Sequence, residues 1–281
     1  MTSTPPYHHL LSDYERRALE EIQAWRNPPQ TWFSSVQAKA SETWNGVTEL
    51  VHKVPGVEWT MENVVTGLLE LTNEITQDSV WTDAVIKDFR SHGHSFNDLA
   101  EVRSLDLEQV DLVLAGLDKK YVGLATVEGA ATGLAGAAGI VPDLVALVSI
   151  NLRAAGEYAA YCGFDTTRSE ERLFAMELLD TVAQPTTNRK KVTIAPVVRT
   201  ASKVARKTGS QVLEQVGIGN AFEAVARRLG ISLTEKKLAQ IVPVTGAFIG
   251  GGLNYLYTTN VCQTAHFLYR ERFIHAKYSA L

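Results

Sequence analysis

Cysteine is scarce in this chain of 281 residues, with only Cys162 and Cys262 present. Two cysteines do not make the disulfide framework of a small secreted domain, and a reducing compartment suits them better. The opening residues, MTSTPPYHHLLSDYERR, also lack the charged-then-apolar order of a signal peptide. These absences predict a cytoplasmic protein, with contact at the inner face of the membrane left open.

Familiar motifs for catalysis and nucleotide binding are also missing. The chain has no HExxH, Walker-A loop, G-x-S-x-G or C-x-x-C, and Gly217-Ile218-Gly219 lacks the third glycine of a dinucleotide site. The sequence therefore favours a non-enzymatic protein and predicts neither a cofactor nor a metal. An enzyme whose site residues are scattered along the chain is not excluded by the lack of motifs.

Strand-like alternation of apolar and polar residues is nearly absent, which predicts an all-α fold. Three capping-box patterns, at Ser12–Glu15, Thr167–Glu170 and Ser232–Glu235, indicate helix starts, and Thr60 is a further candidate cap. Predicted helices cover about 13–25, 31–51, 60–77, 79–90, 96–102, 106–117, 120–140, 142–163, 167–182, 196–216 and 220–229, with a last helix reaching the C-terminus.

Glycine gathers in two of these helices. Gly129, Gly133 and Gly136 recur at i, i+4 and i+7, so they share one helix face on which another backbone can approach closely. Each helical glycine costs about 1 kcal/mol relative to alanine, so the helix over 120–140 needs tight tertiary contacts. Pro142 suits the first turn of the next helix.

A second glycine region follows Ile241, with Pro243, Gly246 and Gly250 in a similar order. We expect the two glycine helices to cross inside a compact multi-helix bundle. No linker divides the chain, so residues 1–281 are predicted to form one domain. In it, tryptophan-rich helices over about 12–90 pack on a core of about 106–281.

Several segments in a fixed order resemble the EcsC family of bacterial proteins. They are SDYERRALEEIQAW, GAATGLAGAAGIVPDL, LRAAGEYAAYCGFD and VPVTGAFIGGGLNY, and the resemblance extends from about Ser12 to Arg272. The family is named for a gene found beside an ABC-transporter pair, and its members lack an agreed biochemical activity. The resemblance therefore implies a helical domain without implying a reaction.

Long apolar runs suitable for a transmembrane helix are absent. The two best windows, 121–141 and 241–261, are interrupted by Glu128 and by Pro243 with three successive glycines. A charge at the centre of a span costs about 2.5–3.5 kcal/mol on insertion scales. Buried helices explain both windows better than membrane spans do.

Positive charge is concentrated in one stretch. Between Thr181 and Leu213 there are seven basic residues and no acid; since the whole chain is −4, the remainder is −11. Such a run favours an anionic membrane surface or an acidic protein partner, although an ordinary solvated helix face has the same pattern. The acidic remainder argues against nucleic acid. The run consists of Arg189, Lys190, Lys191, Arg199, Lys203, Arg206 and Lys207.

Six polar residues occupy apolar surroundings. Buried charges need partners, so Glu128 is expected to pair with Arg153, or Asp143 with Asn254, where the glycine helices cross. The alternative is a metal-dependent or acid–base hydrolase that uses Glu128, Asp143 and His266. The other members of the set are Asn151, Arg153 and Asn254.

Missing side chains on the glycine helices leave space that either a helix or a ligand must fill. A pocket lined by Gly133, Gly136, Gly250 and Asn254 is therefore a candidate site for a lipid or another apolar small molecule. The sequence thus supports two functional hypotheses: a non-enzymatic protein that binds membranes or an apolar ligand, and an unrecognised hydrolase.

Overall fold

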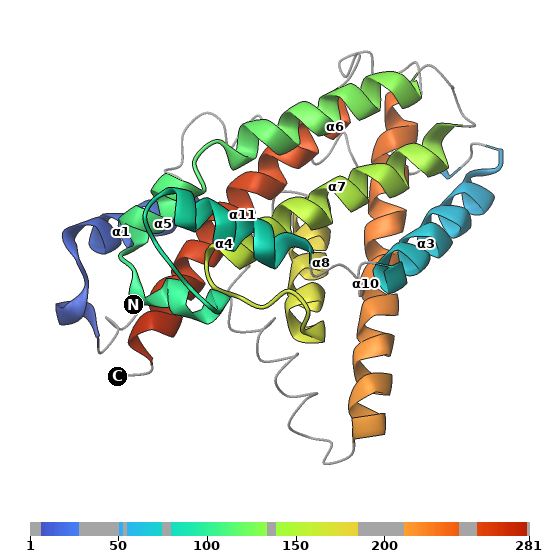
Figure 1. Cartoon of the computed structure of the whole chain (residues 1–281). Helices are drawn as coiled ribbons and strands as arrows, with labels where there is room; N and C mark the ends of the chain where they lie inside the picture. The colour runs from blue at the N-terminus through green and yellow to red at the C-terminus, as the bar shows by residue number, and fades with distance from the viewer. Residues whose placement is uncertain are drawn as a thin grey trace.

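The computed structural model describes residues 7–27, 51–52, 55–74, 80–133, 139–184, 211–241 and 252–279 (Figure 1). The elements in these ranges are all helical and include no strand, which confirms the all-α prediction. They are η1 (His8–Leu10), α1 (Asp13–Arg26), α3 (Val57–Glu74), α4 (Val80–Ser91), η3 (Leu99–Ser104), α5 (Leu107–Val113), α6 (Leu117–Gly133), α7 (Ile140–Tyr161), α8 (Ser169–Ala183), α10 (Gln211–Ile241) and α11 (Gly252–Tyr278).

Helices α7 and α11 lie inside the bundle, and the other described helices pack around them. α7 contacts α3, α4, α6, α8 and α10, whereas α11 contacts α1, α5, α6 and α8 in addition to α7. Figure 1 shows the axes of α6, α7 and α11 roughly aligned, with α10 and α3 at one end of this set. The apolar core follows these two inner helices through the molecule.

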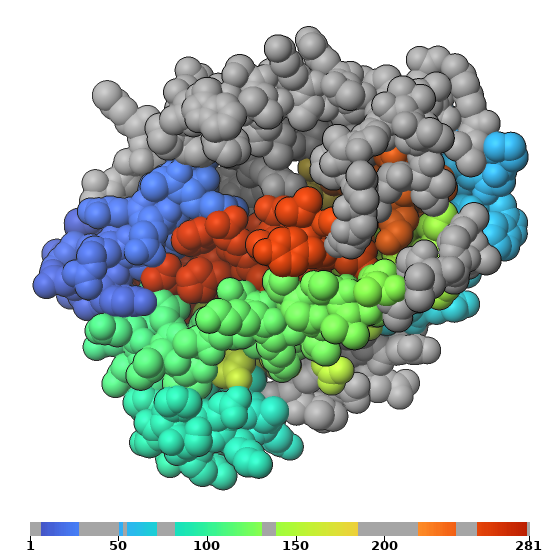
Figure 2. All heavy atoms as spheres, turned by 90° about the horizontal axis from the view of Figure 1, so that it is seen from above, coloured from blue at the N-terminus to red at the C-terminus, as the bar shows by residue number. Residues whose placement is uncertain are grey.

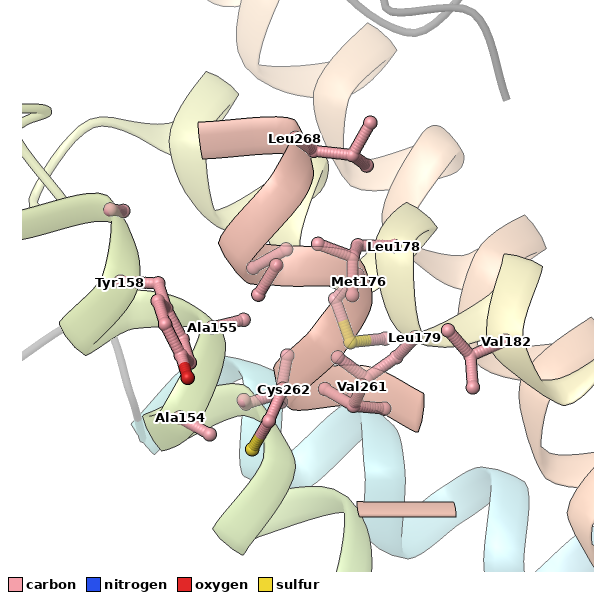
Figure 3. Close-up of a cluster of buried hydrophobic side chains, with 14 of the residues drawn as sticks. Ala154, Ala155, Tyr158, Met176, Leu178, Leu179, Val182, Val261, Cys262 and Leu268 are labelled. Carbon is pink, nitrogen blue, oxygen red and sulfur yellow. The ribbon is translucent and has the colours of Figure 1, made fainter. Parts of the chain in front are cut away.

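Small side chains explain the central position of α7. Ala154–Gly156 and Ala159–Ala160 are all buried, so neighbouring helices can approach the α7 backbone closely. Larger side chains fill the remaining space from the partners, with Met176 and Leu179 on α8 and Val261 on α11 (Figure 3). The small-residue helix at the centre is therefore α7, which follows the glycine helix in sequence.

The glycine helix α6 lies at the surface, although the sequence predicted that other helices would enclose it. Its buried stripe is narrow and consists of Leu117, Tyr121 and Ala125, while Leu124 and Val127 are exposed. α7 and α11 cover this one side, which leaves the opposite side of α6 open (Figure 2). The predicted continuation of α6 through Gly136, and the segment with Pro243, Gly246 and Gly250, lie outside the described residues.

The first capping box is confirmed and also ties the two ends of the chain together. Ser12 Oγ accepts a hydrogen bond from the Glu15 amide, and the Glu15 carboxylate accepts one from the Ser12 amide. The buried Glu15 carboxylate additionally lies 2.9 Å from Lys277 Nζ and accepts a hydrogen bond of 2.6 Å from Tyr278 Oη. Residues near both termini thus share one carboxylate.

Charged residues near the end of α11 attach other helices to it. Arg272 donates two hydrogen bonds, of 2.8 and 2.6 Å, to Glu171 of α8, and its guanidinium lies 4.0 Å from the ring centre of Phe164. Arg26 of α1 pairs with Glu271 through both carboxylate oxygens. These bidentate pairs hold a fixed geometry, so they determine how α1 and α8 dock on α11.

Two predicted caps are wrong by a few residues. Thr167 lies before α8, which begins at Ser169, because its amide and hydroxyl both donate to the Asp165 carboxylate. Thr60 lies inside α3, where its hydroxyl donates to the Gly56 carbonyl. Gly56 has φ +81°, so a turn with left-handed backbone at that glycine precedes the helix.

The third capping box, at Ser232 and Glu235, is wrong because α10 continues through both residues. The predicted break between 216 and 220 is absent for the same reason. A Cβ atom on Gly230 would lie 2.9 Å from Val65 Cγ2, so this glycine serves contact between α10 and α3. The Ser232 hydroxyl meets the Gln184 side chain at 3.3 Å and makes a tertiary contact.

The tryptophans do not act as one set. Trp25 packs on Phe267 with ring centres 5.1 Å apart, as expected for a space-filling side chain, whereas Trp59 is exposed. Trp32 and Trp44 lie outside the described residues. The single-domain assignment for residues 1–281 stays a prediction.

The contact between α10 and α3 is sensitive to side-chain size at Gly230. We expect Gly230→Leu to lower the free energy of unfolding by about 1–3 kcal/mol, because the valine beside it is branched at Cβ and has few ways to move. Gly219 on the same helix faces open space. Gly219→Leu is the matched control, and we expect it to raise stability by up to about 1 kcal/mol because leucine has the higher helix propensity. Urea denaturation measures both, and equal effects would contradict the packing role of Gly230.

Candidate functional site

A cluster of polar side chains lies where four helices meet. Glu128 on α6, Asp143 on α7, Lys237 on α10 and Asn254 on α11 contribute one group each. Asp143 and Asn254 are almost fully buried, and Glu128 and Lys237 are partly buried. We call these four residues the polar junction.

Direct contacts connect the members of the polar junction. Asn254 Nδ2 donates to Glu128 Oε2 at 3.3 Å and to Asp143 Oδ1 at 3.2 Å. Lys237 Nζ lies 2.6 Å from Asp143 Oδ2. Ionised carboxylates only accept hydrogen bonds, so the Asn254 amide must present its nitrogen to both of them. The predicted pairing of Asp143 with Asn254 is confirmed.

Glycine makes this arrangement possible. A Cβ atom on Gly129 would lie 2.8 Å from Asn254 Cγ, so a larger residue would displace the amide. Gly129 belongs to α6 and Asn254 to the first turn of α11, and these two helices are in contact. At this position the expectation of close approach at a glycine is confirmed.

The charges at the polar junction are not balanced within the four residues, which supply two carboxylates and one ammonium group. The pKa of Glu128 is raised, chiefly because burial disfavours its charged form and further because the Asp143 carboxylate lies nearby. Lys237 acts in the opposite direction. Protonation of Glu128 is therefore easier than for an isolated glutamate.

His266 is not part of the polar junction. It follows Asn254 by three turns of α11, which corresponds to roughly 18 Å along the helix. Its ring packs against Tyr158 and Phe267, and burial and Arg270 lower its pKa. Across the described residues, no three His, Cys, Asp or Glu side chains are arranged to hold a metal ion.

Asn151 and Arg153, the remaining members of the six predicted polar residues, lie outside the polar junction. Asn151 donates to the Leu147 carbonyl at 2.7 Å and to the Thr258 hydroxyl at 3.0 Å, which links α7 to α11. Arg153 is exposed on α7, and its pairing with Glu128 stays a prediction. Sequence reasoning missed Lys237 because a lysine pair on a helix is typical of a solvated surface.

A second feature lies beside the polar junction, on the outer side of α6 and α11. Leu124, Val127, Tyr255 and Leu256 are between 45% and 73% exposed. The two helices pack against each other, and Figure 2 shows them next to one another on one face of the molecule. We call these four residues the neutral face. Leu124 and Val127 are three residues apart and Tyr255 and Leu256 are adjacent, and this spacing did not predict from the sequence that their side chains are exposed.

One cavity between α7, α8, α10 and α11 bears on the predicted apolar ligand. It is lined by residues that include Gly156, Met176 and Phe222, and its volume is about 20 Å³. A water molecule needs roughly 10–15 Å³ by the same measure, so an acyl chain does not fit this cavity. Gly136 and Gly250 of the predicted ligand pocket lie outside the described residues, and Gly133 is the last residue of α6.

The basic run from Arg189 to Lys207 lies entirely outside the described residues. No helix in the described ranges is both long enough and apolar enough to cross a bilayer.

The ion pair between Lys237 and Asp143 can be tested by removing one charge and then both. We expect Lys237→Met to lower the free energy of unfolding by about 3–5 kcal/mol, because the buried Asp143 carboxylate loses its cation. Adding Asp143→Asn should restore most of that loss. Lys119→Met, at an exposed position of α6, is the control. Urea denaturation measures the wild type and the three variants, and a double variant as unstable as the single one would contradict the pairing.

The raised pKa of Glu128 predicts a pH-dependent effect on stability. Below the unfolded pKa of about 4.3 the carboxyl is protonated in both states, and wild type and Glu128→Gln should unfold at similar temperatures. As pH rises through the raised folded pKa, the folded wild type must hold an unfavourable charge and loses stability. We therefore expect Glu128→Gln to be the more stable protein at neutral pH. Thermal unfolding across this range is the measurement, with Glu108→Gln as an exposed control, and a pH-independent difference would contradict the argument.

Comparison with known proteins gives a family match. The model of the EcsC protein family matches residues 16–274. The "Uncharacterized protein YdbA" of Bacillus subtilis (strain 168) is 25% identical over 177 residues, which are 63% of this chain and 62% of that protein. The matched part thus spans less than two thirds of that relative, and no solved structure matches the chain. Since the family match includes all four residues of the polar junction and most of the chain, this all-α protein belongs to the EcsC protein family.

Proposed function

We propose that this protein is a non-enzymatic member of the EcsC family that associates with the surface of anionic membranes. The observation that carries the proposal is the neutral face, where two helices in contact with each other, α6 and α11, each expose two apolar side chains. Contiguous exposed apolar side chains on a protein surface commonly mark sites of association.

The composition of the exposed side of α6 suits an interfacial position. From Val122 to Ala130 the only charged residue is Glu128, whose carboxylate is directed to Asn254 of the polar junction. Gly123, Thr126 and Ala130 are exposed together with the two apolar residues of the neutral face on this helix. The outward side chains over this stretch therefore carry no charge that a lipid headgroup region would have to solvate.

Burial of the neutral face in a membrane supplies too little binding free energy by itself, so a second contribution is necessary. Complete burial of a leucine-sized side chain is worth about 1.5–3 kcal/mol, so four half-exposed side chains supply about 4 kcal/mol together. That corresponds to a dissociation constant of about 1 mM, which is too weak for stable association. The neutral face alone would give only transient contact.

The basic run supplies the second contribution in this proposal. Each Lys or Arg near an anionic surface adds about 1 kcal/mol, and the run contains seven of them without an acid between. Peripheral proteins commonly need two such signals for stable attachment. The proposal therefore combines the neutral face with the stretch from Arg189 to Lys207, at the inner face of the membrane.

The polar junction would have a structural role in this function. It connects α6 and α11 beneath the neutral face, so that the exposed side chains of the two helices keep a fixed spacing. The hydrolase alternative lacks geometric support in the described ranges, since His266 is distant from Glu128 and Asp143. An apolar ligand near Gly133, Gly136, Gly250 and Asn254 stays a subsidiary proposal, which native mass spectrometry of the purified protein would test.

Membrane association can be measured by flotation with vesicles of phosphatidylcholine and phosphatidylglycerol. We expect Leu124→Glu with Val127→Glu to weaken binding by at least about tenfold, because two charges replace apolar contacts. Leu112→Glu on α5 is the control for one added charge and is compared with Leu124→Glu alone, since Leu112 is 67% exposed outside the neutral face.

Neutralising Arg199, Lys203 and Arg206 by substitution with Gln tests the second contribution separately. It should weaken binding to anionic vesicles and leave binding to pure phosphatidylcholine unchanged. Equal flotation of the wild type and all variants would contradict the proposed membrane association.

A further inference from the structure

The outer side of α3 carries acid without any base. The four charged residues of this helix are all glutamates, and from Val54 to Ile86 the sequence has six acids and no Lys or Arg. The inner side packs on α7 and α10 through residues such as Val64 and Leu68, which are fully buried. The helix therefore separates a wholly apolar side from an acidic one.

An exposed tryptophan accompanies these acids. Trp59, Glu62 and Glu70 recur at i, i+3 and i+11, which places them along one side of the helix, and Glu58 is adjacent. The Trp59 side chain is 65% exposed, and the three glutamates are exposed without an ion pair to any residue that the structure describes. We call Glu58, Trp59, Glu62 and Glu70 the acidic face. Figure 1 shows α3 at an outer edge of the molecule.

A solvated helix surface explains the glutamates but leaves the tryptophan unexplained. Tryptophan is the side chain most enriched at the energetic centres of protein interfaces, and an indole in water forgoes a large apolar burial. Charge around such an anchor selects the partner by complementarity. The acidic face therefore fits a protein surface that is basic and that can cover an indole.

We propose that the acidic face of one copy docks the basic run, Arg189–Lys207, of a second copy. This run is the complementary segment that the chain itself carries, with seven bases and no acid against the four glutamates of α3, a helix without Lys or Arg. Trp59 is 65% exposed, so the residues that the structure describes leave this face open. In a two-fold dimer the same contact occurs twice, so each copy supplies one acidic face and one basic run.

This inference does not require membrane association, because the dimer forms without lipid. The two proposals are also linked in a testable way, since both use the basic run. Anionic vesicles should then compete with the second copy, and membrane-bound protein should be monomeric. The neutral-face variant, Leu124→Glu with Val127→Glu, should lose vesicle binding and still form the dimer.

The first experiment measures the mass of the purified full chain in solution. Sedimentation equilibrium at low salt should show a monomer–dimer equilibrium. In molar salt the dissociation constant of the dimer should rise at least about tenfold, because salt screens the contact between the charges. Trp59→Ala should weaken the dimer by about tenfold at unchanged unfolding temperature. A wild-type protein that is monomeric at every soluble concentration in low salt would overturn the proposal.

Charge reversal gives the decisive comparison. The triple variant Glu58→Lys, Glu62→Lys, Glu70→Lys should be monomeric. A control with the same change in net charge, Glu20→Lys, Glu101→Lys, Glu108→Lys, alters exposed glutamates on α1, η3 and α5 and should still dimerise. Dimer loss in both triple variants would mean that net charge, not the acidic face, governs association, and would also overturn the proposal.

A rescue experiment guards against simple loss of folding. Arg199→Glu, Lys203→Glu, Arg206→Glu in a second protein should also abolish dimerisation. An equimolar mixture of this protein with the α3 charge-reversed protein should form a heterodimer, because both contacts are again complementary. Two reversed proteins that keep the wild-type unfolding temperature but stay monomeric in the mixture would refute the reciprocal contact.

Discussion

The close approach of α6 to α11 at Gly129 is the constraint from which the functional features follow. Without a side chain at this glycine, the Asn254 amide reaches the carboxylates of Glu128 and Asp143, and the latter reaches Lys237. One missing Cβ atom therefore allows four helices to meet through polar groups. The same approach brings the outer sides of α6 and α11 together and creates the neutral face. A bulkier residue would separate the helices and disperse both features.

Several charged residues of the described helices form ion pairs within the protein. Arg272, Glu271 and Lys277 near the end of α11 each meet an opposite charge on another element, and such pairs have a fixed geometry in a partly buried setting. They position α8 and α1 against α11. The described surface includes four exposed apolar side chains on α6 and α11 and a set of glutamates on α3. Each functional proposal uses one of these two features.

Sequence patterns predicted individual helices well and their environments less well. The capping box at Ser12 and the helix boundary near Gly163 are confirmed, because each depends on atoms a few residues apart. The break expected at Ser232 is wrong, since the glycine and serine in this stretch make contacts with α3 and with Gln184 that no local pattern records. Glycine in a helix signals either an end or a close neighbour, and the sequence does not distinguish them.

For this protein the sequence by itself determined the all-α class and the family resemblance of its ordered glycine segments, and it offered the pairing of Asp143 with Asn254 as one of two alternatives. These follow from periodicity, composition and the cost of burying a charge without a partner. The tertiary structure decided that α6 is exposed, that Lys237 completes the polar junction and that His266 stands apart. Which side of a helix is covered depends on packing between segments more than a hundred residues apart, such as α6 and α11. Hydrophobic periodicity in one helix contains no information about which partner, if any, will cover it.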